Sequence, residues 1–319
     1  MRVVVLGGTK FVGPAAVRRL RAAGHEVAVA HTGAHEHPEV EAVEHLHGDR
    51  DPLLAAGGPV ERWRPDSLVD TFPGGATTGK AEQLLGCAER TGARVVAISS
   101  MDVYQHGVDS GVADGGGMLA LAVDPIPLCE DARRRCGLYP GGGPEHDNVA
   151  MEAVLEGAGL AGVVLRPGAI YGPHRSTREW LFVRKIALGD HLLLLPDGGV
   201  QLFHRVAIDR LARAITAAVE LTPESLWACN VVDPVDWDYS GLARRIGEIL
   251  AWTWEPRKVA FDEVDHPWQT GHAVLGSDRR LREVLGVGPD QPDPTEALEE
   301  TVLWLWGNRE AILDDERTR

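Results

Sequence analysis

Short runs of apolar residues alternate along the chain with longer segments whose apolar side chains recur at helical spacing. Val3, Val4, Val5 and Leu6 form the first run, which predicts a fully buried strand. The same pattern predicts further strands over residues 26–30, 42–47, 67–71, 93–99 and 162–165, and helices over 11–25 and 80–91. Strands that alternate with helices of this length are typical of a parallel sheet with right-handed crossovers. The predicted fold class is therefore α/β, with a Rossmann-type doubly wound parallel sheet.

The bend between the first strand and the first helix is rich in glycine. Gly7 allows the turn, Gly8 allows close approach of the backbone, and Gly13 lets the helix pack on the strand. Free backbone N–H groups at the positive end of a helix are what a dinucleotide pyrophosphate binds. We therefore predict dinucleotide binding by Gly7, Gly8, Thr9, Lys10, Phe11, Val12 and Gly13. A plain tight turn between a strand and a helix is the alternative.

The sequence Gly-Gly-Thr-Lys-Phe-Val-Gly at residues 7–13 resembles the bend of the extended short-chain dehydrogenase/reductase superfamily. The match is to its atypical, epimerase/dehydratase-like branch, because a charged residue replaces the middle glycine of Gly-x-x-Gly-x-x-Gly. Further matches extend this resemblance from residue 2 to about residue 306. It implies a dinucleotide-binding domain over residues 1–175 and about 203–235. Residues 176–202 and 236–319 would form a small, discontinuous C-terminal substrate lobe.

The end of the second predicted strand bears on the choice of cofactor. An acidic side chain at residues 29–33 would bind the ribose 2′-hydroxyl and specify NAD, and none is present. Lys10 is placed to meet a 2′-phosphate, and His31 ends the strand segment. We therefore predict that the cofactor is NADP or NAD, with NADP slightly favoured.

A second cofactor segment follows the third predicted strand. Gly-Asp-Arg-Asp at residues 48–51 is similar to the segment that the family places at the adenine. The resemblance implies that Asp49 accepts a hydrogen bond from the adenine amine, with Arg50 beside it. The alternative is that Asp49 caps a turn after the strand.

A serine follows the predicted strand over 93–99. Ser-Ser-x-x-Val-Tyr, which begins at Ser99, matches a family pattern that places a hydroxyl beside the reacting oxygen of the substrate, and Ser100 is the matching position. Ligands bind at the carboxyl ends of strands in such sheets. We expect Ser100 to polarise a substrate hydroxyl or carbonyl by hydrogen bonding.

The active Tyr-x-x-x-Lys pair of the family should open the helix that carries Glu152. Alignment on Glu152 puts Pro144 at the tyrosine and Asn148 at the lysine. In the family the lysine lowers the pKa of the tyrosine, which exchanges a proton with substrate. We therefore predict a degenerate active site whose proton chemistry has to be rebuilt.

His146 is one candidate for that chemistry, because its ordinary pKa suits proton transfer near neutrality. Asp147 or Glu145 would orient its ring, and Asn148 would keep a hydrogen bond to the ribose. The alternative is that His146 is a solvated residue at an ordinary helix start.

Two other interpretations remain open. Tyr104 or Tyr139 would supply a displaced phenol, the latter from the segment between residues 105 and 144. The second of these interpretations is that redox chemistry is lost.

The glycine-rich segment between residues 105 and 144 includes Pro-Leu-x-Glu-Asp at residues 127–131, which resembles the substrate rim of the family. We predict that this segment is a lid, and simple disorder is the alternative.

A strong family match comes after the strand over residues 162–165. Arg-Pro-Gly-Ala-Ile-Tyr-Gly-Pro at residues 166–173 resembles the turn whose backbone passes the nicotinamide carboxamide and leads into the substrate lobe. The resemblance places Pro167 and Gly168 at the cofactor and Tyr171 at the substrate.

Arg205 is the candidate for binding an anionic group of the substrate. A guanidinium holds phosphate or carboxylate in bidentate fashion. The alternative for Arg205 is a structural ion pair with Asp209 or Glu220.

Composition limits the partners. The 319 residues carry a formal net charge of −15, which disfavours nucleic acid because phosphates must be neutralised by clustered basic residues. No apolar run is long enough to span a membrane, and residues 1–7 already form a core strand rather than a leader. We expect a cytoplasmic protein without nucleic-acid or membrane partners. The oligomeric state is left open, and the family resemblance implies a homodimer through the helices at 80–91 and 148–157, which correspond to those that pair in family dimers.

Neither cysteines nor histidines predict a metal centre. The four cysteines show no C-x-x-C spacing. His35-Glu36-His37 is conceivable as part of a metal site, but no further ligand at helical spacing accompanies it. We therefore predict a solvated loop and no metal.

The predicted function is an NAD(P)-dependent epimerase, dehydratase or reductase. It would act on a hydroxyl or carbonyl carbon of a small polar or sugar-like substrate, with non-standard acid/base residues. Two alternatives remain: a catalytically silent NADP-binding or regulatory protein, and a non-redox lyase, isomerase or cyclase on the same scaffold.

Overall fold

The computed structural model describes residues 1–72, 75–105, 125–136, 138, 143–234, 237–263, 273–289 and 291–318. Tyr139 and most of the predicted lid lie outside the described residues.

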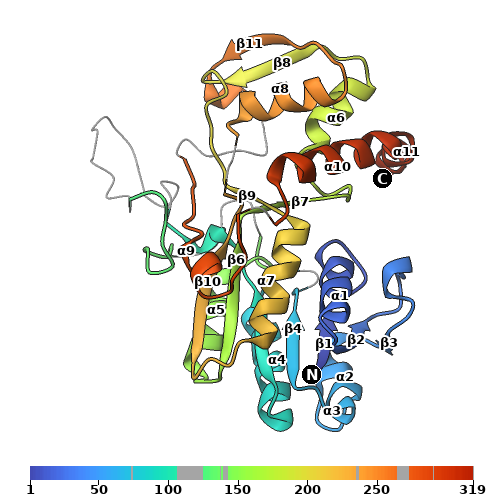
Figure 1. Ribbon diagram of the computed structural model, residues 1–319, viewed down its shortest axis with the longest axis vertical. Helices are drawn as coiled ribbons and strands as arrows, with labels where there is room; N and C mark the ends of the chain where they lie inside the picture. Colours follow the sequence, from blue (N-terminus) through green and yellow to red (C-terminus); the bar gives the residue numbers. More distant parts are fainter. Residues whose placement is uncertain are drawn as a thin grey trace.

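A seven-stranded parallel sheet forms the centre of the molecule (Figure 1). Its order is β10-β6-β5-β4-β1-β2-β3, so the winding direction reverses between β1 and β4. This order is that of a doubly wound Rossmann-type sheet, and the predicted fold class is confirmed. The strands are β1 (Arg2–Leu6), β2 (Glu26–His31), β3 (Glu44–His47), β4 (Ser67–Asp70), β5 (Arg94–Ile98), β6 (Gly162–Pro167) and β10 (Leu226–Val231).

The central strands of this sheet are covered on both faces, which explains why they are mostly apolar without alternation, whereas the edge strand β3 is more polar and partly exposed. Side chains of neighbouring strand residues point to opposite faces. Val3 and Val5 therefore pack against α1 (Val12–Ala22) and α7 (Ile208–Glu220), whereas Val4 and Leu6 pack in the cluster with α4 (Thr78–Thr91) and α5 (Asn148–Gly157). Full burial of each such side chain stabilises the fold by roughly 1.5–3 kcal/mol.

Between β3 and β4 the chain forms two short helices, α2 (Arg50–Leu54) and α3 (Pro59–Trp63). Single-turn 3-10 helices lie at η1 (Pro38–Val40), η2 (Met101–Val103) and η3 (Phe261–Glu263). The short helix α9 (Arg279–Glu283) contacts β10.

A smaller lobe lies above the sheet in Figure 1 and has its own apolar cluster. In this lobe β8 (Leu192–Pro196) pairs in parallel with β11 (Glu255–Val259). Its helices are α6 (Trp180–Ala187), α8 (Tyr239–Ile249), α10 (Pro294–Gly307) and α11 (Arg309–Arg317). The strands β7 (Ala169–Tyr171) and β9 (Arg205–Ala207) pair where the chain passes between the sheet and this lobe. The domain boundaries given above stay a prediction.

Steric limits shape the bend between β1 and α1. Gly7 has a φ of 83°, as a tight turn requires, and a Cβ at Gly13 would lie 2.4 Å from the carbonyl oxygen of Gly7. A Cβ at Gly8 would lie 2.4 Å from Cγ1 of Val29, so the close approach at Gly8 is to β2. The bend therefore packs glycine backbone against backbone and leaves α1 to begin directly behind it.

Across the described ranges, no helix combines the length and apolar character needed to cross a bilayer.

Gly13→Ala tests how tightly the bend is packed. We expect the added methyl to destabilise the protein by roughly 1–3 kcal/mol, because the backbone atoms that it meets cannot move aside as a side chain would. The measurement is the free energy of unfolding in urea.

Gly79→Ala is the matched control, since Gly79 lies in α4 with open space around a Cβ. It should leave stability unchanged or raise it by up to roughly 1 kcal/mol. Equal stability of the Gly13→Ala and Gly79→Ala variants would contradict the packing argument.

Candidate active site

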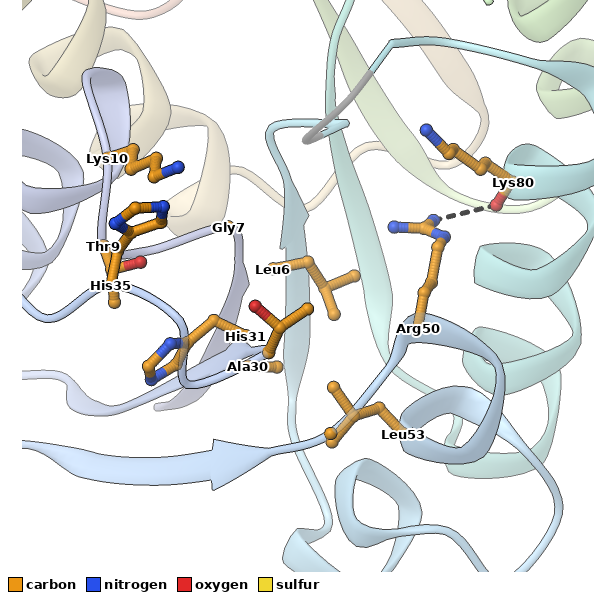
Figure 2. Close-up of a pocket in the computed structure, with 12 residues that line it drawn as sticks. Leu6, Gly7, Thr9, Lys10, Ala30, His31, His35, Arg50, Leu53 and Lys80 are labelled. Carbon is orange, nitrogen blue, oxygen red and sulfur yellow. Dashed lines mark hydrogen bonds between the residues drawn. The ribbon is translucent and has the colours of Figure 1, made fainter. Parts of the chain in front are cut away.

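A pocket of about 240 Å³ lies at the carboxyl ends of β1 and β2 (Figure 2). This edge of a doubly wound sheet, beside the reversal of strand order, is where ligands bind in such folds. The lining comes from the glycine bend, the end of β2, α2 and α4: Leu6, Gly7, Thr9, Lys10, Ala30, His31, Thr32, His35, Gly48, Arg50, Leu53 and Lys80.

The charged part of this lining is cationic. Figure 2 shows Lys10 and His35 close to each other on one side of the pocket and Arg50 on the other. The Arg50 guanidinium is fixed by the carboxylate of Asp70 and by the carbonyl of Lys80, to which it donates at 2.9 Å. None of the twelve described lining residues is acidic. The pocket therefore suits an anionic group, with an apolar floor at Leu6 and Leu53.

Several of the residues predicted to bind the cofactor lie in this pocket. Gly7, Thr9, Lys10, His31 and Arg50 line it. The others in the bend, Gly8, Phe11, Val12 and Gly13, build the turn and the start of α1.

Phe11 takes a positive φ of 47° immediately before α1. Its ring packs on the ring of His174, with 4.8 Å between the ring centroids. This is an uncommon backbone conformation for a bulky residue. It turns the chain from the bend into the helix.

Asp49 lies between two lining residues. Its side chain is exposed and makes no capping hydrogen bond to α2, which disfavours the turn-capping alternative. Lys80, His35 and Leu53 were not predicted, because they come from α4, a loop and α2 and share no local motif.

A second cluster lies beyond the end of β5. The His146 ring and the side-chain amide of Asn148 both bind the carboxylate of Asp102, the amide at 3.0 and 3.1 Å. The Asp102 carboxylate is almost fully buried, whereas the His146 side chain is 38% exposed. The hydrogen bond with Asp102 raises the pKa of His146 above its ordinary value, so Asp102 favours the protonated form of this ring.

The described contacts of His146 favour neither Asp147 nor Glu145 as the carboxylate that orients its ring. Asp147 caps α5 by accepting a hydrogen bond from the amide of Ala150 at 3.0 Å, and Glu145 is exposed. Asp102 takes the orienting role instead. Asn148, predicted at the ribose, is buried and bound to Asp102. That Pro144 and Asn148 replace the tyrosine and lysine of the family stays a prediction.

Ser100 lies next to this cluster. Its hydroxyl accepts a hydrogen bond from the amide of Asp102 at 3.1 Å at the start of η2, and the residue is only partly buried. The neighbouring Ser99 points into the core and donates to Glu152 at 2.5 Å. Ser100 and His146 are therefore both tied to Asp102, one through its backbone and one through its carboxylate.

Tyr104 occupies a position that does not favour the predicted role of a displaced phenol. It is 1% exposed, and its hydroxyl donates to Asn230 at 2.5 Å and accepts from Arg166 at 3.0 Å. Burial raises its pKa to about 12, so the phenol holds its proton. Its hydroxyl belongs to the core network of Arg166 rather than to a solvent-accessible site.

Tyr171 and Arg205 occupy buried positions as well, which does not favour the predicted substrate contacts. The Tyr171 hydroxyl donates to Asp233 at 2.7 Å, and burial raises the pKa of Asp233 to about 6. The Arg205 side chain is 2% exposed and pairs with Glu179 at 3.0 Å. The structural alternative for Arg205 is therefore the one that the geometry favours, although with a different acidic partner.

Pro167 and Gly168 lie where β6 ends. A Cβ at Gly168 would lie 2.3 Å from the carbonyl oxygen of His204, so glycine is required there by the neighbouring segment before β9. The predicted contact of Pro167 and Gly168 with a nicotinamide stays a prediction.

No family model matches the chain. The chain is 30% identical over 240 residues to 3-diazoavenalumate denitrifying reductase of a Streptomyces species, a match that covers 69% of this chain and 72% of that protein.

Solved structures of similar fold cover nearly the whole chain. The dTDP-glucose 4,6-dehydratase DesIV from Streptomyces venezuelae, with NAD and TYD bound, is 22% identical with a TM-score of 0.72, and 98% of each chain is covered. The UDP-glucose 4-epimerase of Stenotrophomonas maltophila, with NAD and formylated UDP-arabinopyranose, is 18% identical with a TM-score of 0.74, covering 98% of this chain and 99% of that one. The chain therefore belongs to the extended short-chain dehydrogenase/reductase superfamily, among its NAD-dependent epimerase/dehydratase-like proteins.

Proposed function

We propose that this protein is an NAD(P)H-dependent reductase of a small polar substrate and that it prefers NADP(H) to NAD(H). The observation that carries the proposal is the cationic pocket beside the glycine bend, at the reversal of strand order. A further support is the His146–Asp102 pair beyond the end of β5, on the opposite side of that reversal from the pocket.

The described residues fit the two ends of a dinucleotide. The bend at residues 7–13 is packed so closely that side chains are excluded at Gly8 and Gly13, which suits a pyrophosphate at the start of α1. The adenosine would lie in the pocket toward β2, and the nicotinamide would extend across β4 toward β5. When bound, the reduced cofactor supplies a hydride.

The proposed preference for NADP(H) rests on charge. Lys10 and Arg50 are cations in the pocket, and the end of β2 places His31 where an acidic residue would select the 2′-hydroxyl of NAD. Burial lowers the pKa of His31, so its ring is kept neutral. A 2′-phosphate would therefore be attracted mainly by Lys10 and Arg50.

Proton transfer is assigned to His146. Asp102 orients its ring and stabilises the imidazolium, as the raised pKa indicates. The protonated ring would give its proton to the substrate, and the hydroxyl of Ser100 would bind the reacting group. Asn148 holds the other side of the Asp102 carboxylate and so fixes its position.

The relatives support the proposed direction and substrate class. The curated relative is named a reductase, and it is more similar in sequence to this chain than the sugar-nucleotide enzymes described above. We therefore propose reduction as the reaction, and diazo and carbonyl compounds are the first substrates to assay. Sugar nucleotides form the second panel. A homodimer through α4 and α5 is part of the proposal.

Lys10→Ala tests the cofactor preference. Loss of one cation beside a 2′-phosphate should weaken NADPH binding by about tenfold, equivalent to roughly 1.4 kcal/mol, and leave NADH binding almost unchanged. Nicotinamide fluorescence titration gives both dissociation constants. Lys185→Ala, whose amine pairs with Asp190 in the lobe, is the control and should change neither. Failure of the wild-type protein to bind either nucleotide would refute the cofactor assignment.

The pH dependence tests the His146–Asp102 pair. Because the pKa of His146 is raised, the proton-donating form persists below that raised value, and the rate of reduction should fall as pH rises through it. Asp102→Asn should move this fall to lower pH. His146→Gln should abolish it and lower kcat by roughly 10²–10⁴-fold.

Asp147→Ser is the comparison variant, because serine keeps the cap of α5 and removes only the weaker electrostatic influence of Asp147 on His146. Its pH profile should move to lower pH by less than that of Asp102→Asn. A pH profile of Asp102→Asn that is identical to the wild-type profile would remove His146 from the mechanism. Product formed without a change in nicotinamide absorbance would instead indicate a non-redox reaction.

A further inference from the structure

Three histidines lie on one face of the sheet at its β3 edge. Parallel register pairs His31 with His47 and Val29 with His45, and residues two apart on a strand share a face. His31 from β2 and His45 and His47 from β3 therefore converge. Glu36, from the segment that joins these strands, reaches the same point. We call His31, Glu36, His45 and His47 the histidine cluster.

The distances within the histidine cluster fit a single metal ion. Ligand atoms about 2.0–2.1 Å from a tetrahedral zinc ion lie roughly 3.3 Å from one another. Here the Glu36 oxygens lie 3.2 Å from Nδ1 of His45 and 3.3 Å from Nε2 of His47. Nε2 of His31 lies 2.9 Å from Nδ1 of His45 and 3.8 Å from the Glu36 carboxylate. One ligand atom from each residue lies within 4.8 Å of all the others.

Neighbouring backbone groups hold the rings in place. Nε2 of His45 binds the carbonyl of Val40 at 2.9 Å, which leaves Nδ1 directed at the centre of the cluster. This arrangement is typical of metal-binding histidines, whose second nitrogen donates to a carbonyl. Nδ1 of His31 accepts a hydrogen bond from the backbone amide of Gly33 at 3.2 Å. Ligation through Nε2 would place a proton on Nδ1, and the exposed Gly33 amide would then bind water.

Of the motif at residues 35–37, only Glu36 belongs to the histidine cluster. His35 lines the pocket, and His37 accepts the amide of Glu39 at 3.3 Å to cap η1, so neither joins Glu36 at the cluster. The ligands come instead from register between two strands. This geometry differs from the isolated His35-Glu36-His37 motif on which the prediction of no metal was based.

We propose that the histidine cluster binds one divalent cation of the zinc class, with three imidazoles and one carboxylate as ligands. Nitrogen and oxygen donors in a tetrahedron suit zinc, and four protein ligands make the site structural rather than catalytic. The ion ties the segment between β2 and β3 to the edge strand. Because His31 also lines the cationic pocket, the ion fixes one wall of that pocket.

The test is metal binding by the full-length, tag-free chain after treatment with a chelator. Competition with a chromophoric chelator should show one equivalent of Zn²⁺ per chain, and Co²⁺ should give the intense visible absorption of a tetrahedral site. His45→Ala and His47→Ala should each weaken Zn²⁺ binding by more than about 100-fold. Loss of a residue that only supports a ligand weakens metal affinity by at most about 100-fold, so a larger effect identifies a direct ligand. Zn²⁺ should also raise the melting temperature of the wild-type protein.

His35→Ala is the matched control, since it removes an exposed histidine next to Glu36 but outside the cluster. It should bind Zn²⁺ as the wild-type protein does. The proposal would be overturned if the wild-type chain bound no equivalent of Zn²⁺, or if Co²⁺ gave the weak spectrum of an octahedral site. It would also be overturned if His45→Ala and His47→Ala bound Zn²⁺ as tightly as the wild-type protein. None of these measurements depends on nucleotide binding or turnover, so their failure would leave the proposed reductase untouched.

Discussion

Burial of the parallel sheet on both faces is the constraint on which the rest of the structure depends. A strand covered on both sides has no place for polar side chains along its length, so chemistry moves to the strand ends. In this chain both the cationic pocket and the His146–Asp102 pair follow carboxyl ends of buried strands. The core and the site are therefore two results of the same arrangement of apolar residues.

A buried ion pair beside the site is one exception to the apolar core. Arg166 on β6 pairs with Glu152 on α5 at 2.7 Å, and both side chains are almost fully buried. Ser99 and Tyr104 complete the network through hydrogen bonds to Glu152 and Arg166. Such a pair is costly to desolvate but costlier to break, because one charge would remain unpaired. It holds the start of α5 beside the end of β5, which is what brings His146 to Asp102.

The sequence predicted the elements whose pattern is local. The strands buried on both faces, and helices such as α1 and α4, lie close to their predicted positions because apolar spacing alone defines them. β11 was not predicted, since its residues are mostly exposed and give no apolar run. In the pocket, the glycine bend and Arg50 were predicted from motifs, whereas Lys80 is brought there by tertiary structure.

Partners distant in sequence account for the rest. Asp102 lies 44 positions before His146, and Glu179 lies 26 positions before Arg205, so local spacing pointed to neighbouring acidic residues in both cases. The histidine cluster is likewise not visible in local spacing, because strand register sets His31 opposite His47. A one-residue slip of β3 would turn His45 and His47 to the other face. Leu46, which lies between them and packs against the apolar cluster on the opposite face, favours that register and therefore bears on whether the edge of the sheet can hold a cation.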